Sequence, residues 1–212
     1  MAALDLEEQE KLDELKAWWK AYGNLVMLAT AAFVLGIAGT QGWRYYQNGQ
    51  AQQAAELYDV FQKALPGKDP KRIGEAANAI MDKFPGSAYA SRAAMISARA
   101  SFDAGDAQNA KSRLEWALGH AKEDELKDLV RLRLAAILLD EKKFDEALKL
   151  LESAHGAAFD GLYADLKGDA LGAQGKLAEA RAAYQLAFDK TEPNSSYRNL
   201  IQMKLDALGA AK

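Results

Sequence analysis

The chain has 212 residues, half of them hydrophobic and 27% charged, and its formal net charge is −3. Four prolines, no cysteine and few β-branched residues indicate a folded helical protein, and they exclude disulfides and thiol chemistry. Residues 44–212 hold 24 bases and 24 acids, so the chain lacks the basic surface by which proteins bind nucleic acid.

The first two predicted segments are an acidic head and a membrane span. Residues 1–20 carry six acids against three lysines, whereas residues 21–43 carry no charged side chain. About 20 helical residues are about 30 Å long, which matches the hydrocarbon core of a bilayer. A transmembrane helix over 21–43 is therefore favoured over a buried soluble helix. Aromatic residues suited to the two membrane interfaces flank it, namely Trp18, Trp19 and Tyr22 before it and Trp43, Tyr45 and Tyr46 after it.

A cleaved signal peptide is the other alternative for this segment. Signal peptides begin with a short basic region, but here a 20-residue acidic segment comes first, so we expect the anchor to be retained. Orientation follows nearby Lys and Arg. Lys11, Lys16 and Lys20 precede the span, whereas only Arg44 follows it until Lys63. We therefore expect a cytoplasmic N-terminus and translocation of the main domain.

Small residues recur every four positions in the span, at Ala32, Gly36 and Thr40. Such a face allows another transmembrane helix to approach closely, so these three residues are the predicted transmembrane contact. Ala and Gly are common in membrane spans, and chance composition is the alternative explanation.

Three later segments, 98–118, 135–154 and 168–188, repeat one pattern of small and large residues. Each starts with a small residue, has alanines twelve and nineteen positions later, and has a large apolar residue between them. In chain order these are Ala98, Ala135 and Gly168, then Ala110, Ala147 and Ala180, then Ala117, Ala154 and Ala187, with Leu114, Leu151 and Tyr184 as the large residues. Small residues at these offsets let paired helices pack closely, and a period near 34 is typical of tetratricopeptide repeats. The usual tryptophan is absent from all three.

A weaker copy around Ala77 precedes these repeats. Residues 71–84 would be its second helix, residues 44–65 its first, and residues 66–70 the turn between them. Residues 197–209 would form a capping helix, with Leu200, Met203, Leu205 and Leu208 as its apolar residues.

The expected fold is thus all-α, with an N-terminal single transmembrane helix, a tetratricopeptide-like right-handed helical solenoid and a C-terminal capping helix. Its expected parts are a cytoplasmic acidic segment (1–20), the transmembrane helix (21–43) and the repeat domain (44–212). A general amphipathic helical bundle is the alternative.

No residue pattern points to catalysis. His120 and His155 have no metal-ligand partner at helical spacing, and the acidic pairs flank turns. The glycines do not form a phosphate-binding loop. We expect no catalytic residue, no metal and no cofactor.

Binding by a surface is the remaining possibility. In such solenoids the first helix of each pair lines the concave side, and Arg and aromatic side chains there suit protein recognition. Packing against neighbouring repeats is the alternative for each residue. The predicted protein-binding residues are Arg92, Met95, Arg99, Phe102, Leu132, Leu139, Asp165 and Asp169, with Leu129 and Leu162 on the same helices.

The sequence resembles the YfgM-like family over essentially its whole length. The resemblance is carried by Trp-Trp-Lys at 18–20, GWRYY at 42–46, YADLKGDAL at 163–171 with the following Gly-Lys turn, and IQMKLDAL at 201–208.

Members of that family are ancillary subunits of the SecYEG translocon. The resemblance implies a Gram-negative inner-membrane protein with a periplasmic repeat domain. It implies association with the translocon and with a membrane-anchored peptidyl-prolyl isomerase of the PpiD type, and transfer of emerging polypeptides to periplasmic chaperones. It offers no catalytic residues. A structural scaffold for another cell-envelope assembly is the alternative, and the role of the acidic head stays open.

Overall fold

The computed structural model of the chain describes residues 6–209, and side-chain surroundings from residue 9 onward. The backbone divides into two compact units, Met1–Ala51 and Gln52–Lys212. Between residues 6 and 209 every regular element is a helix, which confirms the all-α prediction. Residues 1–5 of the acidic segment and residues 210–212 lie outside the described part of the chain.

The first unit is formed by most of helix α1 (Leu6–Ala64). An 18-residue stretch of this helix is long and apolar enough to cross a membrane, and only 6% of that stretch is buried. Leu25, Leu28 and Leu35 are each at least 70% exposed. A core helix of a soluble protein would bury such side chains, so this exposure fits a helix that faces lipid.

The aromatic residues cluster at both ends of the apolar stretch. The rings of Trp18 and Tyr22 are 5.8 Å apart, and those of Trp43 and Tyr46 are 6.1 Å apart, measured between centroids. Within the stretch, the hydroxyl of Thr30 donates to the carbonyl oxygen of Val26 at 2.8 Å. Aromatic residues thus flank the span, as is typical at membrane interfaces. The hydroxyl of Thr30 is bonded within the helix, as a polar group in lipid requires.

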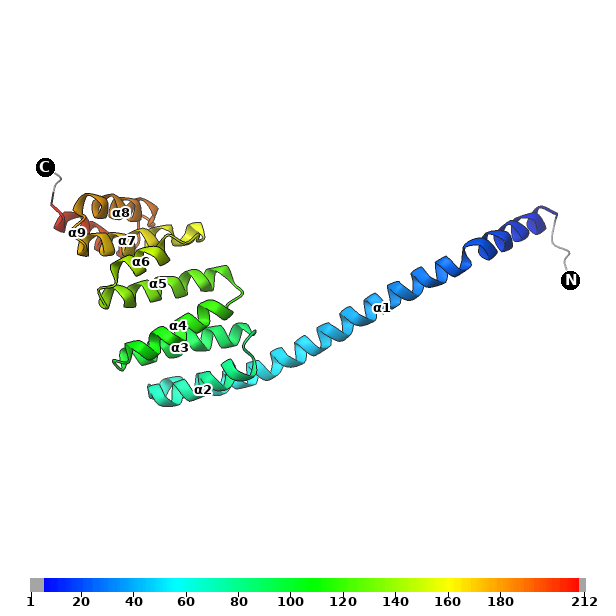
Figure 1. Cartoon of the computed structure of the whole chain (residues 1–212), viewed down its shortest axis with the longest axis horizontal. Coiled ribbons are helices and arrows are strands. Elements are labelled where there is room, and N and C mark those ends of the chain that lie inside the picture. Colours follow the sequence, from blue (N-terminus) through cyan, green and yellow to red (C-terminus); the bar gives the residue numbers. More distant parts are fainter. Residues whose placement is uncertain (1–5, 210–212) are drawn as a thin grey trace. The chain divides into compact units, whose positions relative to one another are not determined.

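In the second unit, helical hairpins follow one another and each helix packs mainly on its neighbours in sequence (Figure 1). This arrangement confirms the predicted solenoid and is not that of a general bundle. After the end of α1 the elements are η1 (Leu65–Gly67), α2 (Pro70–Lys83), α3 (Ala88–Asp103), α4 (Ala107–His120), α5 (Asp124–Asp140), α6 (Phe144–Leu151), η2 (Ala157–Phe159), α7 (Asp160–Ala173), α8 (Leu177–Lys190) and α9 (Ser196–Ala207).

The three full repeats share one turn between their two helices. Two positions after the end of each first helix lies a residue with positive φ, namely Gly105 at 83°, Lys142 at 60° and Gly175 at 78°. The next residue donates its backbone N–H to the carbonyl five positions back, at 2.8–2.9 Å in all three repeats. This is the Schellman motif, which favours glycine because the left-handed conformation crowds a Cβ. The second repeat has a lysine instead.

Small residues hold the helices of each pair together, as the repeat pattern predicts. Ala110, Ala147 and Ala180 are fully buried. Gly168 of α7 lies so close to the ring of Tyr184 in α8 that an added Cβ would be 2.4 Å from Cε1. The large positions are buried as well, since Leu114, Leu151 and Tyr184 are 2%, 4% and 6% exposed. The repeat register is confirmed.

One member of the pattern does not follow it. Ala154 was expected on the buried face of a second helix, but this prediction is wrong, because α6 ends at Leu151 and Ala154 is exposed. The segment after α6 is instead tied to α5, where the Asp128 carboxylate accepts the backbone N–H of Gly156 at 2.9 Å. The helix therefore stops before its next turn.

The weaker first pair and the cap are also present. Phe61, in the last turns of α1, packs with Ile73, Ala77 and Ile80 of α2 in one apolar cluster. In α9, Leu205 is buried together with Ile201. Of the other apolar residues named for the capping helix, Leu200 and Met203 are 45% and 67% exposed.

Candidate functional site

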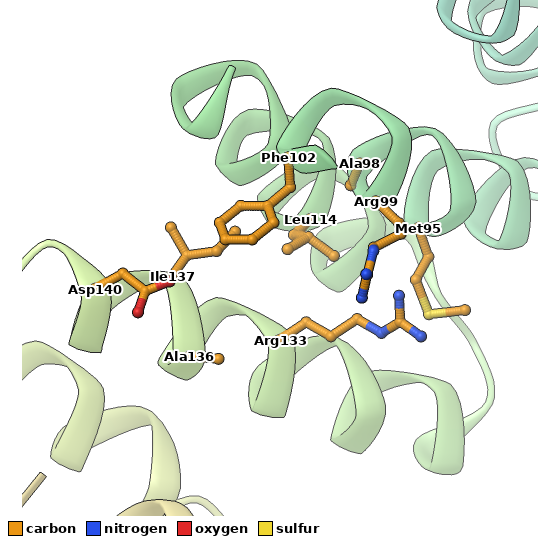
Figure 2. Close-up of a pocket in the computed structure, with 9 residues that line it drawn as sticks. All are labelled: Met95, Ala98, Arg99, Phe102, Leu114, Arg133, Ala136, Ile137 and Asp140. Atoms are coloured by element: carbon orange, nitrogen blue, oxygen red, sulfur yellow. The ribbon is translucent and has the colours of Figure 1, made fainter. Parts of the chain in front are cut away.

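A pocket of about 180 Å³ lies between α3 and α5, the first helices of two successive repeats (Figure 2). Its residues recur every three or four positions on each helix, so one stripe of each helix faces the pocket. The small side chains of Ala98 and Ala136 leave room for the pocket to reach Leu114 of α4. The lining residues are Met95, Ala98, Arg99 and Phe102 from α3, Leu114 from α4, and Arg133, Ala136, Ile137 and Asp140 from α5.

Two arginines give this pocket a positive end. The Nε of Arg99 donates to the carboxylate of Asp103 at 2.8 Å, and this bond raises the pKa of Arg99. Burial lowers the pKa of Arg133, and the charge of Arg99 lowers it further. From residue 9 to residue 209, no carboxylate forms an ion pair with Arg133. The Arg133 guanidinium is thus half-buried next to a like charge.

The rest of the pocket is apolar, with one acid at the far end. Figure 2 shows the ring of Phe102 and the side chain of Ile137 between the two arginines and Asp140. Phe102 is half-buried and Ile137 is 5% exposed. Asp140 is exposed, and no bond to another side chain satisfies its carboxylate within the described residues. The pocket is therefore cationic at one end, apolar in the middle and acidic at the other end.

A second pocket of about 470 Å³ adjoins the first and shares Met95 with it. The guanidinium of Arg92 pairs with the carboxylate of Glu123 at 3.5 Å on its wall. The positive charge of Arg92 is thus already compensated within the chain. The other lining residues are Tyr58, Ile96, Glu125, Leu126, Leu129 and Phe159.

The structure brings some of the predicted binding residues together and separates others. Met95, Arg99 and Phe102 line the first pocket, while Arg92 lines only the second. Leu139 packs partly against the core around Ala147.

Two of the predicted residues are not on the surface. The expectation that Leu132 and Asp165 face the groove is wrong, since their exposed fractions are 6% and 2%. Leu132 packs in the core between α5, α6 and α7.

Asp165 and Asp169 hold the capping helix. Lys204 of α9 donates to both carboxylates at 2.8 Å, and the Tyr197 hydroxyl donates to Asp165 at 2.6 Å. Tyr184 donates to Asp169 at 2.7 Å. Burial, followed by these bonds to the carboxylates, raises the pKa of Tyr184 and Tyr197. The two acids are thus engaged inside the chain.

Arg133 and Asp140 are the charged pocket residues that were not predicted. The predicted residues Leu132 and Leu139 of α5 occupy the same repeat positions as Met95 and Phe102 of α3. Equivalent positions point in the same direction, whereas a pocket between two helices is lined by facing, opposite edges. The sequence signal that could have found Arg133 is its place directly before the apolar run of residues 134–139 in α5.

The histidines are occupied by stacking contacts. The ring of His120 stacks on Trp116 with centroids 4.0 Å apart, and the ring of His155 stacks on Tyr163 at 3.9 Å. In the part of the chain that the structure describes, no three His, Asp or Glu side chains group as a metal site.

The small-residue face of the span is open. An added Cβ at Gly36 would meet no atom within 4 Å, and Ala32 and Thr40 are exposed on the same helix. The hydroxyl of Thr40 donates to the carbonyl oxygen of Ile37 at 2.9 Å. A contact of this face with another transmembrane helix stays a prediction.

Comparison with known proteins identifies relatives over nearly the whole chain. A family profile described as a tetratricopeptide repeat-like domain matches residues 16–210. A protein of Neisseria gonorrhoeae named ancillary SecYEG translocon subunit is 35% identical over 97% of this chain and 99% of its own length. Proteins of the same name from Haemophilus influenzae and Escherichia coli are 29% and 25% identical, over 97% and 95% of this chain and 100% and 96% of their own lengths.

Solved structures agree with the fold. The protein MamA of Desulfovibrio magneticus, in a form that starts at its residue 41, superposes with a TM-score of 0.54 at 21% identity. The superposition covers 73% of this chain and 89% of that protein. This likeness concerns the stacking of helical hairpins alone.

Proposed function

This chain belongs to the tetratricopeptide repeat-like family of ancillary SecYEG translocon subunits, and we propose that it is a non-catalytic adaptor that binds at that translocon. The observation that carries the proposal is the extent of the match, which covers 97% of this chain and 99% of the Neisseria relative. Membrane anchor and repeat domain are therefore shared as one arrangement.

The proposed topology has residues 1–20 in the cytoplasm, residues 21–43 in the inner membrane and residues 44–212 in the periplasm. It is supported by the three lysines before the span against one arginine after it. A protease added to right-side-out membrane vesicles should digest the chain beyond about residue 50 and spare the head. Protection of the repeat domain would reverse the proposed orientation.

The repeat domain is proposed as the protein-binding part. Its two adjoining pockets place arginine and aromatic side chains on one face, a composition that suits protein recognition. The anchor would confine the repeat domain to the membrane, and confinement raises the effective concentration of a binding site without any added contact. Polypeptides that leave the translocon, a PpiD-type isomerase and periplasmic chaperones are the proposed partners.

Copurification tests this function. The full-length chain, tagged and extracted from membranes in mild detergent, should recover the translocon subunits, and an unrelated single-span protein with the same tag should not. Recovery of cell-wall or outer-membrane machinery in place of the translocon would favour a structural scaffold and contradict the proposal.

A further inference from the structure

We propose that the pocket between α3 and α5 binds an extended polypeptide segment that has an acidic side chain, a bulky apolar side chain two residues away and a basic side chain two residues further on. This inference rests on the proposed function, because it specifies which polypeptides the repeat domain would hold. The proposed anionic ligand group is a side-chain carboxylate of a peptide.

The two guanidinium groups of the pocket are the proposed binding site for the acidic residue of the peptide. The Asp103 carboxylate accepts a hydrogen bond only from the Nε of Arg99. The terminal nitrogens of that guanidinium therefore have no bond within residues 9–209. Arg133 has no carboxylate partner in the same range and is half-buried beside Arg99. A carboxylate between the two groups would relieve their repulsion and accept bidentate hydrogen bonds.

The middle of the pocket is the proposed binding site for the bulky apolar residue of the peptide. Phe102, Leu114 and Ile137 line it, and Ala98 and Ala136 leave it open. The whole pocket has a volume of about 180 Å³, and a cavity of about 150 Å³ accommodates benzene, so the pocket can hold one large apolar side chain. A leucine or phenylalanine side chain therefore fits this space.

The spacing follows from the geometry of α5. Arg133 and Asp140 are seven residues apart, which is about 10 Å along a helix. An extended peptide advances about 3.3 Å per residue and points every second side chain to the same side. Three side chains at positions one, three and five therefore reach the arginine end, the apolar middle and Asp140, and flexible side chains take up the remaining difference. Asp140 then pairs with the basic side chain.

The binding experiment uses the full-length chain in a neutral detergent and a labelled peptide with both ends capped. The peptide carries Glu, Phe and Lys at alternate positions of a Ser-rich sequence. Fluorescence anisotropy should detect binding that weakens as salt is raised. Replacement of the peptide Glu by Gln, or of its Phe by Ala, should weaken binding about tenfold or more, since each change removes one proposed contact.

The matched protein variants are Arg133→Gln and Arg72→Gln. Arg133→Gln should weaken binding about tenfold or more, whereas Arg72→Gln removes an exposed arginine from α2, outside this pocket, and should leave binding unchanged. Circular dichroism checks that both remain folded. Arg133→Glu should restore binding to a peptide whose Glu is replaced by Lys, a result that loss of folding cannot produce.

Equal binding by wild type and Arg133→Gln would overturn the assignment, as would no binding of the capped peptide by the wild type. Binding that requires an uncapped C-terminus would also overturn it, since the terminal carboxylate would then be the ligand. Copurification with the translocon separates the two proposals. If copurification persists while peptide binding fails, only the pocket assignment is wrong. If the peptide binds but the translocon does not copurify, the pocket assignment stands and the proposed translocon function is wrong.

Discussion

A methyl group at position 168 should loosen the last repeat, although alanine is the better helix former. An added Cβ at Gly168 would lie 2.4 Å from Cε1 and 2.5 Å from Cδ1 of Tyr184. The ring cannot move away freely, because its hydroxyl donates to Asp169 at 2.7 Å and the Lys204 ammonium lies 5.4 Å from the ring centroid. Gly168→Ala therefore forces α7 and α8 apart or displaces Tyr184.

Three contributions set the size of the effect. Gly→Ala in an open helix favours folding by about 0.5–1 kcal/mol. Overpacking costs roughly 1–3 kcal/mol, and loss of a hydrogen bond to a charged group costs about 1.5–3 kcal/mol. The net destabilisation should be about 2–4 kcal/mol, which lowers Tm by roughly 4–16 °C for a domain of this size.

Thermal unfolding of the full-length chain, followed by far-ultraviolet circular dichroism, measures the shift. Gly172→Ala is the matched control in the same helix, because its added Cβ would meet only ordinary contacts at 3.8 and 3.9 Å, so its Tm should stay equal or rise slightly. In a Tyr184→Leu background the penalty of Gly168→Ala should largely disappear. An unchanged Tm for Gly168→Ala, or an undiminished penalty in that background, would refute this packing argument.

Three further changes test other parts of the chain. Ala147→Leu should cost roughly 1–3 kcal/mol, because Ala147 is fully buried between α5 and α6, and a neutral thermal shift would contradict that contact. Lys142→Gly should raise Tm, because a non-glycine residue at a φ of 60° is strained by about 1–2 kcal/mol. The greater freedom of glycine in the unfolded chain offsets part of this gain. A lower Tm would show that the lysine is not strained. Gly36→Leu should weaken copurification with the membrane partner and leave Tm unchanged, and full recovery would exclude this helix face as the contact.

The repeat register could be predicted from sequence because close helix packing restricts residue size. Ala110, Ala147 and Ala180 are fully buried, so the spacing of the alanines in the sequence reflects the spacing of the helix contacts. The cap was predicted as an element, but its buried face was not, since Leu200 and Ile201 are adjacent and only tertiary contact decides which is covered.

The binding surface was harder to predict because it depends on which helix edges face each other. The sequence placed Met95, Arg99 and Phe102 on one stripe of α3, and all three do line one pocket. It could not show that the opposite edge of α5 supplies Arg133. Nor could it show that Asp165 is buried by bonds to Tyr197 and Lys204, residues more than 30 positions away.

The bonds between α9 and α7 have a consequence for the lifetime of the protein. A stack of hairpins opens from its ends, because an end hairpin has a neighbour on one side only. Here the first opening step would break the bonds of Lys204 and Tyr197 to the buried carboxylate of Asp165. A buried charge without a partner has an unfavourable free energy. Release of the twelve residues of α9 is thereby tied to the opening of the last hairpin. A single proteolytic cut in the link over residues 191–195 would separate α9 from α8 in the chain, so an intact link helps the domain withstand unfolding.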